Sequence, residues 1–433
     1  MSNRSKLDCD ILVIGAGPAG IAATVSAAEA GARVVLVDDN PLPGGQIWRA
    51  ALGESKQNVW QNGHAVSWLQ RLRNCGATQL YATRVVARMS DGVVLAEDES
   101  DAIEIKFRSV ILATGARELL LPFPGWTLPN VFAPGGLQAL VKSGFSVVGK
   151  RVVIAGTGPL LFAVASFLQS KGAKIEGVFD QAPLQRMVRF AISLFRRPSM
   201  ITAAIRYRAS FAGSPLHFGW WPVSADGADR IRSITMTNGS RTKNIECDML
   251  ACGFHLIPNT ELQAAFGCKI QDGRTTVDEL QQSSVEGVFS VGESTGIGGL
   301  DLALIEGEIA GLAAVGKEAD ARKLFQERAA LNKLARAMDQ AFALRTKLRH
   351  LVREDTIVCR CEDVRWSSLR PQQSMRSARL HTRCGMGPCQ GRICGPALHF
   401  LAGWENSATR PPIFPVRLST LIQEPQASDE TNN

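Results

Sequence analysis

A glycine-rich turn near the N-terminus constrains the fold of this chain more than any other feature. Gly15, Gly17 and Gly20 form a Gly-x-Gly-x-x-Gly pattern, which follows the apolar run Ile11–Ile14 and precedes an alanine-rich segment. In such a strand–turn–helix unit, the glycines allow the tight turn, the approach of a pyrophosphate and the closing of the helix on the strand. Asp38 follows 23 positions after Gly15, where a carboxylate can accept ribose hydroxyl groups. The sequence therefore predicts a βαβ unit that binds a dinucleotide.

The same pattern recurs in weaker form over Val152–Asp180, which predicts a second nucleotide domain. Gly156 and Gly158 are retained, but the third glycine is lost. Phe179 stands at the position that corresponds to Asp38, and Asp180 comes one residue later. Two alternatives stay open: a bound adenine nucleotide, either NAD(H) or a mononucleotide such as ATP, and an empty structural domain. The acidic strand end argues against NADP, whose 2′-phosphate prefers arginine.

The length and charge of the chain limit its class. With 433 residues it exceeds what one hydrophobic core organises, so we expect two or three domains. Hydrophobic residues make up 45% and charged residues 20%, as in globular α/β enzymes. The net charge of +8 is spread along the chain without basic runs that alternate with aromatics. This distribution favours anionic cofactors or an acidic partner over nucleic acid.

The ten cysteines are distributed unevenly. The first seven residues contain no apolar run of a secretion signal, so we expect a cytoplasmic, reducing compartment. Five cysteines fall between Cys359 and Cys394, which in that compartment indicates metal binding rather than disulfides. Prolines or a glycine turn interrupt two long uncharged stretches, Leu119–Val141 and Val152–Gln169, so we expect no transmembrane segment.

The spacing of the clustered cysteines favours an iron–sulfur site. Cys359 and Cys361 form a Cys-x-Cys pair, followed much later by Cys384, Cys389 and Cys394. Thiolates bind iron–sulfur clusters in fours. Zinc is the alternative, although a Cys-x-Cys pair falls outside its common knuckles. Spacing alone leaves the ligand set open, because Cys384 and Cys389 are separated by four residues, as are Cys389 and Cys394.

Three further segments resemble the elements by which flavoproteins with two dinucleotide domains hold FAD. They are Pro43-Gly44-Gly45-Gln46, Ala113-Thr114-Gly115 and Ser290-Val291-Gly292-Glu293. The resemblance spans Asp10–Val315 and implies that the second domain is inserted between the halves of the first. The FAD-binding residues that it implies are Gly15, Gly17, Pro18, Ala19, Gly20, Asp38, Gly45, Gln46, Val86, Thr114, Gly115, Gly292 and Glu293. A nucleotide in the second domain would contact Gly156, Gly158 and Asp180.

The segment Asp355–Pro396 resembles the bacterioferritin-associated-ferredoxin-like [2Fe-2S] domain. Cys-Arg-Cys-Glu-Asp-Val at 359–364 and Thr-Arg-Cys-Gly-Met-Gly-Pro-Cys-Gln-Gly-Arg-Ile-Cys-Gly-Pro at 382–396 carry the likeness. The ligands that it implies are Cys359, Cys361, Cys389 and Cys394, with Cys384 as an alternative.

The two resemblances together point to the α subunits of hetero-oligomeric amino-acid dehydrogenases: opine oxidases, D-hydroxyproline dehydrogenase, dye-linked L-proline dehydrogenase and hydrogen cyanide synthase. The family implies a flavoprotein β subunit that oxidises the C–N bond, a small third subunit in some members, and an α subunit that relays electrons. The six histidines are dispersed, so we name no catalytic residue. The alternatives are a self-sufficient NAD(P)H-dependent FAD reductase and a non-redox assembly subunit that binds nucleotide and zinc.

The expected fold is α/β, with two Rossmann-like dinucleotide-binding domains, the second inserted in the first, and a small C-terminal [2Fe-2S] domain. Within the tail, Pro415–Ile422 is expected to pack as a strap. The expected boundaries are 1–117 and 270–316 for the FAD-binding domain, 118–269 for the second nucleotide-binding domain, 317–353 for a helical linker, 354–405 for the [2Fe-2S] domain and 406–433 for the tail.

Overall fold

The computed structural model describes residues 4–48, 59–194, 198–405 and 410–422, which belong to two compact units. Unit 1 combines Met1–Gly115, Asn259–Arg328 and Thr409–Asn433, and unit 2 combines Ala116–Pro258 with Ala329–Ala408. The boundary thus lies at 258/259 instead of 269/270, because Asn259 and the residues after it bind back to unit 1. The expected linker, residues 317–353, is itself divided, because its residues from Ala329 onward belong to unit 2. Residues 354–405, called the cysteine segment below, belong to the same unit.

A five-stranded parallel sheet forms the centre of unit 1, in the order β21-β8-β2-β3-β4. The strands are apolar because both faces of a parallel sheet are covered. Alternate residues of β2 divide between two cores: Ile11 and Val13 face a helical layer, and Leu12 and Ile14 face a second sheet. The bounds are Val288–Ser290 (β21), Ser109–Leu112 (β8), Ile11–Ile14 (β2), Val34–Val37 (β3) and Thr78–Leu80 (β4).

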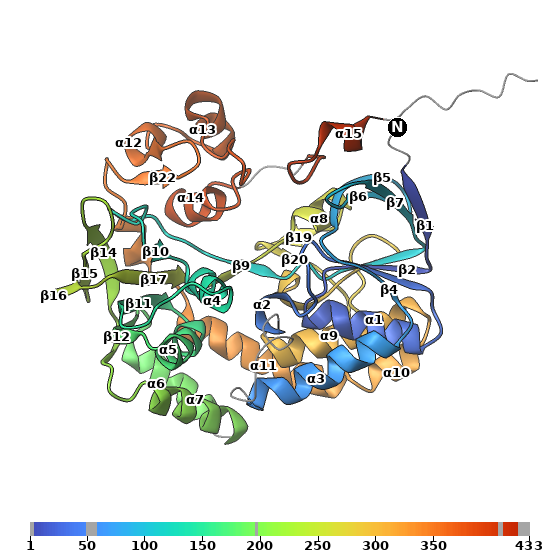
Figure 1. Cartoon of the computed structure of the whole chain (residues 1–433), viewed down its shortest axis with the longest axis horizontal. Helices are drawn as coiled ribbons and strands as arrows, with labels where there is room; N and C mark the ends of the chain where they lie inside the picture. Colours follow the sequence, from blue (N-terminus) through green and yellow to red (C-terminus); the bar gives the residue numbers. More distant parts are fainter. Residues whose placement is uncertain (1–3, 49–58, 195–197, 406–409, 423–433) are drawn as a thin grey trace, which may run out of the picture. The chain divides into compact units, whose positions relative to one another are not determined.

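The helical layer of unit 1 is built on two helices that pack through small residues. A Cβ atom added to Gly307 of α9 would lie 2.1 Å from the carbonyl oxygen of Ala19 in α1, so only glycine allows this approach. Figure 1 shows α1 and α9 beside α3 and α10. The bounds are Pro18–Glu29 (α1), Gly45–Trp48 (α2), Val59–Asn74 (α3), Glu261–Ala265 (α8), Leu300–Ala314 (α9) and Glu318–Arg322 (α10).

The second sheet of unit 1 has the order β1-β7-β6-β5 and is covered by the C-terminal segment. Ile413 is 1% exposed in the core between the two sheets. Arg417 donates to the carbonyl oxygen of Glu99 at 2.6 Å, and Thr420 donates to the Glu97 carboxylate at 2.8 Å. The predicted strap is therefore confirmed. The bounds are Ser5–Asp8 (β1), Arg84–Ser90 (β5), Val93–Glu97 (β6), Ala102–Lys106 (β7) and Leu418–Leu421 (α15).

Unit 2 contains a second five-stranded parallel sheet, in the order β10-β17-β11-β12-β13. Val152 and Ile154 of β11 pack toward helices α4 and α5, and Val153 and Ala155 pack toward the three-stranded sheet β14-β15-β16. The bounds of the central sheet are Val131–Phe132 (β10), Met249–Phe254 (β17), Arg151–Thr157 (β11), Lys174–Asp180 (β12) and Leu216–Phe218 (β13).

The remaining elements of the nucleotide part of unit 2 lie around that sheet. The helices are Pro134–Lys142 (α4), Leu160–Ser170 (α5), Leu184–Ser193 (α6) and Pro198–Ser210 (α7). The three-stranded sheet comprises Trp221–Asp226 (β14), Ser233–Thr237 (β15) and Thr242–Glu246 (β16). A further pair comprises Ala116–Glu118 (β9) and Leu256–Pro258 (β18).

The cysteine segment of unit 2 has a small core of its own and also contacts the nucleotide part. Trp126 donates its indole N–H to the carbonyl oxygen of Ile357 at 2.6 Å, and Ala397 joins the core beneath the three-stranded sheet. Pro371 lies just beyond the end of α12, where its missing backbone N–H does not interrupt the helix. The bounds are Phe325–Phe342 (α11), Thr346–His350 (η3), Ile357–Cys359 (β22), Val364–Arg365 (β23), Trp366–Leu369 (α12), Met375–Thr382 (α13) and Cys394–Ala402 (α14).

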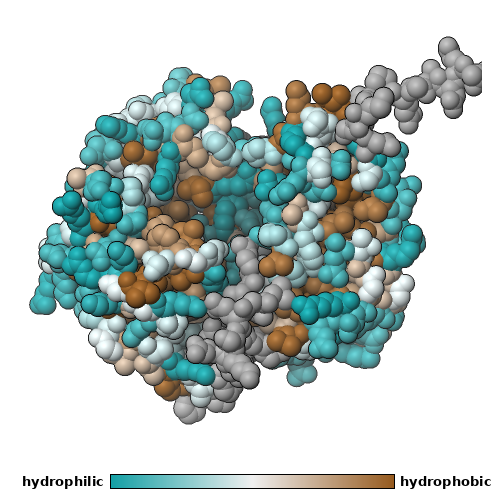
Figure 2. Space-filling view, in the orientation of Figure 1, coloured by the Kyte–Doolittle hydropathy of each residue, from teal (hydrophilic) through white to brown (hydrophobic). Residues whose placement is uncertain are grey.

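Hydrophilic residues predominate on the face that Figure 2 shows, and hydrophobic residues form only small separate patches there. Among the described residues, no helix combines the length and the apolar character needed to cross a membrane.

Candidate cofactor sites

The glycine turn of unit 1 is held tightly on its inner side and is open on its outer side. Gly15 has a φ of +109°, and a Cβ on Gly20 would lie 1.7 Å from the carbonyl oxygen of Gly15. A Cβ on Gly17, by contrast, would meet nothing within 4 Å. Gly17 precedes α1, whose first turn points its backbone N–H groups outward, with Pro18 at its start. The turn therefore has the shape and the donors that a pyrophosphate requires.

Asp38 directly follows β3, and its carboxylate is hydrogen-bonded to neighbouring groups of the protein, among them the glycine turn. Its carboxylate accepts hydrogen bonds from the backbone N–H of Ala16 and from the backbone and side chain of Asn40. Burial raises its pKa, and these hydrogen bonds oppose the rise. The next residue, Asp39, keeps an exposed carboxylate that lies 3.5 Å from the Arg84 guanidinium. Asp39 was not among the predicted residues, although two adjacent acids at a strand end were visible in the sequence.

The Pro-Gly-Gly-Gln segment packs directly on the glycine turn. Gly44 donates its backbone N–H to the carbonyl oxygen of Ala16 at 2.7 Å. A Cβ on Gly45 would lie 3.0 Å from the Cα of Gly17, and Gly45 has a φ of +57°. Gln46 follows with an exposed side chain in α2. Two segments that are far apart in sequence thus form one wall of the site.

Thr114 and Gly115 follow β8 at the same edge of the sheet. Thr114 donates its hydroxyl to the carbonyl oxygen of Asn259 at 2.6 Å and accepts from the Gln263 side chain at 2.9 Å. The backbone N–H of Asn259 donates to Gly115. These contacts explain why the chain returns to unit 1 at residue 259. Asn259 and buried Gln263 had no recognisable sequence pattern.

Gly292 and Glu293 follow β21, also at the carboxyl edge. The backbone N–H of Gly292 donates to the Glu306 carboxylate at 2.9 Å, and Thr295 donates to the same oxygen at 3.1 Å. Glu293 accepts from the backbone N–H of Gly299 at 2.9 Å. Glu306 is 5% exposed, and burial raises its pKa to about 7. Its position in the otherwise apolar run Leu302–Gly307 was the sequence signal for it.

Val86 is the outlying member of the set implied for FAD. It is fully buried in β5, within the second sheet of unit 1. Its carbonyl oxygen accepts the backbone N–H of Ile413 at 2.8 Å. The other implied segments lie at the carboxyl ends of β2, β3, β8 and β21, the edge at which parallel sheets bind dinucleotides.

In the second nucleotide fold, the acid that corresponds to Asp38 is Asp180 and not the residue expected from the sequence spacing. A Cβ on Gly156 would lie 1.7 Å from the carbonyl oxygen of Gly253, so this turn is as tight as the first. The pairing of β11 with β12 shifts by one residue between Val152 and Val153, and Asp180 consequently pairs with Gly156. The expectation that Phe179 corresponds to Asp38 is therefore wrong, because a β-bulge absorbs the extra residue.

Asp180 makes the same kind of contact as Asp38. It accepts from the backbone N–H of Gly158 at 3.2 Å, from the Thr157 hydroxyl at 3.0 Å and from the backbone N–H of Ala182 at 2.8 Å. Its side chain is fully buried, and burial raises its pKa to about 6.

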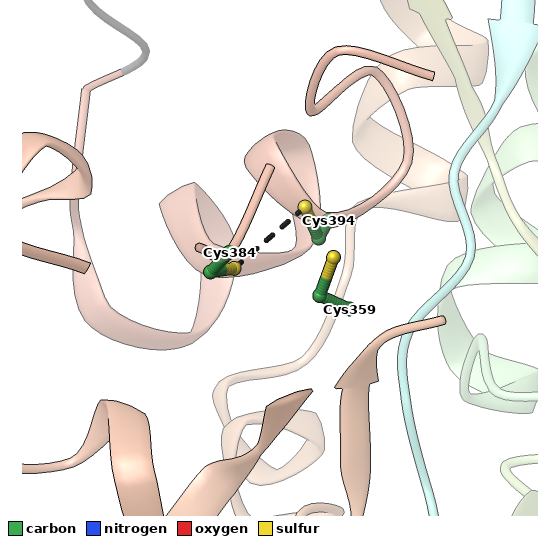
Figure 3. Close-up of side chains that lie close together, drawn as sticks. All are labelled: Cys359, Cys384 and Cys394. Atoms are coloured by element: carbon green, nitrogen blue, oxygen red, sulfur yellow. Dashed lines mark hydrogen bonds between the residues drawn. The ribbon is translucent and has the colours of Figure 1, made fainter. Parts of the chain in front are cut away.

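Three cysteine side chains converge from three elements of the cysteine segment (Figure 3). Cys359 ends β22, Cys384 follows α13, and Cys394 begins α14. Their sulfur atoms lie within 4.8 Å of one another, and the distance from Cys384 Sγ to Cys394 Sγ is 3.9 Å. All three are buried. Hydrogen bonds from the other two thiols lower the pKa of Cys359, which favours a thiolate there.

The other two cysteines of the segment form a separate, more exposed pair. The distance from Cys361 Sγ to Cys389 Sγ is 3.5 Å. A Cβ on Gly387 would lie 2.3 Å from the Cβ of Cys361, so glycine is required where this loop meets the Cys-x-Cys turn. All four cysteines implied as ligands thus belong to one of two close groups, and Cys384 joins the buried one.

Comparison with known proteins identifies the family. Residues 9–310 match the family model described as pyridine nucleotide-disulphide oxidoreductase. The chain is 31% identical over 419 residues to hydrogen cyanide synthase subunit HcnB of Pseudomonas protegens, covering 88% of this chain and 89% of that protein. It is also 31% identical over 462 residues to one of the opine oxidase subunits of Rhizobium meliloti (strain 1021), covering 95% and 98%.

The fold has relatives among solved structures. L-proline dehydrogenase from P. horikoshii superposes with a TM-score of 0.71 at 18% identity, over 98% of this chain and 81% of that chain. Thioredoxin reductase from T. acidophilum gives a TM-score of 0.56 at 20% identity, over 72% of this chain and 99% of that one. By sequence and by fold, the chain belongs to the pyridine nucleotide-disulphide oxidoreductase family and is an FAD-dependent oxidoreductase.

Proposed function

We propose that this chain is the electron-relaying subunit of an amine or amino-acid dehydrogenase, with FAD in unit 1 and a [2Fe-2S] cluster in the cysteine segment of unit 2. The substrate C–N bond is oxidised in a partner flavoprotein. The observation that carries the proposal is that one chain combines the glycine turn and strand ends typical of an FAD site with five cysteines in two close groups. The relatives named as subunits of opine oxidase and of hydrogen cyanide synthase support the assignment to a complex.

The fit of FAD rests on unit 1. Gly17 leaves room for the pyrophosphate at the start of α1, and Gly45 closes the adjacent wall. Because Asp38 is 7% exposed and already accepts three hydrogen bonds, we assign the accessible carboxylate at the strand end to Asp39. Gly292 and Glu293 bring the start of the helical pair η2 (Gly292–Ser294) and α9 to the same edge. The residues implied for FAD thus form a continuous edge, apart from Val86.

The fit of the cluster rests on the thiols. We assign Cys359, Cys361, Cys389 and Cys394 as ligands, and Cys384 as a buried neighbour of Cys359 and Cys394. Cys361 is exposed, so one side of the site faces solvent, as electron transfer to a further carrier requires. When bound, FAD accepts a hydride equivalent, and an iron–sulfur cluster passes on single electrons.

The proposal is tested by native purification of the tagged chain. We expect a flavoprotein partner to co-purify, with FAD, about two iron atoms and about two acid-labile sulfides per chain. Under anaerobic conditions, opines, hydroxyproline or proline should bleach the flavin absorption of the complex and leave that of the isolated chain unchanged. Zinc in place of iron, or oxidation of these substrates by the isolated chain, would contradict the proposal.

A further inference from the structure

The end of helix α11 is docked on the mouth of the second nucleotide fold. Thr157 ends β11 and Gln181 follows β12. The Gln181 side-chain amide donates to the carbonyl oxygen of Phe342 at 3.4 Å, and the Thr157 hydroxyl, which donates to Asp180 at 3.0 Å, lies 3.4 Å from the same carbonyl oxygen. Gln181 also donates to Ala343 at 3.3 Å, and Arg186 donates to the same carbonyl at 3.0 Å. Three hydrogen bonds from Gln181 and Arg186 thus tie the carbonyl groups of Phe342, the last residue of α11, and of Ala343 to the second nucleotide fold.

Apolar contacts accompany these hydrogen bonds. Phe342 is 2% exposed and forms one cluster with Ala182 and Ala341, against which Met187 and Phe190 of α6 pack. The rings of Phe190 and Phe342 meet edge to face, with centroids 5.8 Å apart. Because the burial of a large aromatic side chain is strongly stabilising, this docking is not a loose surface contact.

The first nucleotide fold of the same molecule provides an internal reference. There Gly15 and Gly17 are partly exposed, and Asp39 presents an exposed carboxylate beyond the strand end. In the second fold Gly156 is buried, and Gln181, which corresponds to Asp39, is fully buried. The two folds share their strand and turn geometry, but the glycine turn and the strand end are open to solvent only in the first fold.

The covered part is the one that would hold an adenosine. In a dinucleotide-binding fold, the acid at the end of the second strand binds the adenosine ribose. Here Asp180, like Asp38, accepts three hydrogen bonds within its own fold, from Thr157, Gly158 and Ala182. The next residue, Gln181, is fully buried and donates to the carbonyl groups of Phe342 and Ala343, where the first fold has the exposed Asp39. Gly158 is buried as well, although a Cβ on it would meet no described atom within 4 Å.

We propose that residues 341–345 occupy the adenosine end of the second nucleotide fold, so that this unit takes neither NAD(H) nor ATP. Residues 341–345 thus fill the site with part of the chain itself. They also hold the residues that lead into the cysteine segment against the nucleotide part of unit 2. Reducing equivalents therefore reach the flavin of unit 1 by a route other than a pyridine nucleotide in unit 2. This inference does not depend on the identity of the metal or of the oxidised substrate.

Ligand binding to the full-length, FAD-loaded protein tests the proposal. Calorimetric titration with NADH, ADP and ATP should show no saturable binding up to about 1 mM. Phe342→Ala removes the apolar anchor and should tighten ADP or NADH binding at least about tenfold, since the apparent affinity rises with the fraction of open sites. Leu331→Ala, a buried substitution earlier on α11, is the matched control and should gain no binding.

Amide hydrogen exchange over residues 338–345 provides the second readout. In the wild-type protein, 1 mM ADP should leave the exchange of this segment unchanged. Stoichiometric binding of NADH, ADP or ATP to the wild-type protein, with faster exchange of the segment, would overturn the proposal. So would a folded Phe342→Ala protein with normal FAD content and no gain in binding, because another feature would then exclude the nucleotide.

Discussion

Asp180 pairs with Gly156 across β11 and β12, and its carboxylate accepts the backbone N–H of Gly158 two residues further on. In unit 1, Asp38 accepts the backbone N–H of Ala16 in the same way. The sequence separation between acid and amide is 22 residues in both units. The strand-end acid therefore stabilises the glycine turn in each fold, whether or not a nucleotide is bound.

Replacing Asp180 by alanine should destabilise unit 2. The substitution leaves the backbone N–H groups of Gly158 and Ala182 buried without their acceptor, and each such group costs about 1–3 kcal/mol. We expect lower protection of the β11 and β12 amides in hydrogen exchange and a lower Tm. FAD content should stay at the wild-type level, since the FAD elements belong to unit 1. Unchanged protection would show that the acid is not needed for the turn.

Replacing Gly20 by alanine should abolish FAD binding. Its Cβ would lie 1.7 Å from the carbonyl oxygen of Gly15, so the turn and α1 must separate. We expect the FAD content of the purified protein to fall more than about tenfold, equivalent to at least about 1.4 kcal/mol of binding free energy. Gly213→Ala is the control, because a Cβ there would meet nothing within 4 Å. Equal FAD content in the two variants would contradict the proposed site.

The first glycine turn could be predicted because all its determinants are local. A strand, a turn and a helix follow one another over Ile11–Glu29, and each requires its own residue types. The role of Asp38 in that turn was not predictable, because its side chain contacts backbone groups that carry no sequence signature. The bulge before Gly177 likewise leaves no pattern, yet it decides whether Phe179 or Asp180 faces the turn.

Substituting the five cysteines one at a time should show which of them bind the cluster and whether Cys384 is only a neighbour. Cys359→Ser, Cys361→Ser, Cys389→Ser and Cys394→Ser should each reduce iron and acid-labile sulfide strongly. Cys384→Ala should retain them, with only the stability change of a small core substitution. Iron and sulfide assays on the five purified variants provide the measurement. Loss of iron in Cys384→Ala together with its retention in Cys389→Ser would instead make Cys384 the ligand.

The Glu306 carboxyl should make stability depend on pH. Burial raises its pKa from 4.5 to about 7, so the folded state binds the proton more tightly than the unfolded state. The corresponding stabilisation, on the order of 3 kcal/mol, is present below about pH 4.5 and is lost as the pH rises through about 7. Glu306→Gln lacks this titration. The Tm of the variant relative to wild type should therefore rise between about pH 5 and 8, and a constant difference would contradict the assignment.

The C-terminal strap should contribute to the stability of unit 1. Ile413 is 1% exposed, and its replacement by alanine should cost about 2–5 kcal/mol. Leu418→Ala removes an apolar side chain that is 73% exposed and should be nearly neutral. Thermal unfolding of the two variants gives the comparison. A similar Tm for both would mean that the strap does not cover the core of unit 1 in solution.

The parts of the sites that the sequence left open depend on contacts between distant segments. Apolar runs followed by glycine turns indicated the two nucleotide folds, and cysteine spacing indicated a thiol site. Neither pattern could place Phe342 against Ala182, because an amphipathic helix end carries no information about which surface it covers. The grouping of Cys384 with Cys359 and Cys394 likewise depends on how α13 and α14 pack.

The docking of α11 also bears on how such a chain can be divided or recombined. Leu348, Leu351 and Ala397, all beyond the second nucleotide segment, belong to the core beneath its three-stranded sheet. A protein shortened to end at Arg328 would lose these side chains together with Phe342 and expose the apolar surface beneath them. The cysteine segment is thus not an independently folding domain joined to the end of the chain, because it shares a core with the nucleotide part of unit 2. Exchange between homologues should succeed only when Ala329–Ala408 is transferred together with Ala116–Pro258.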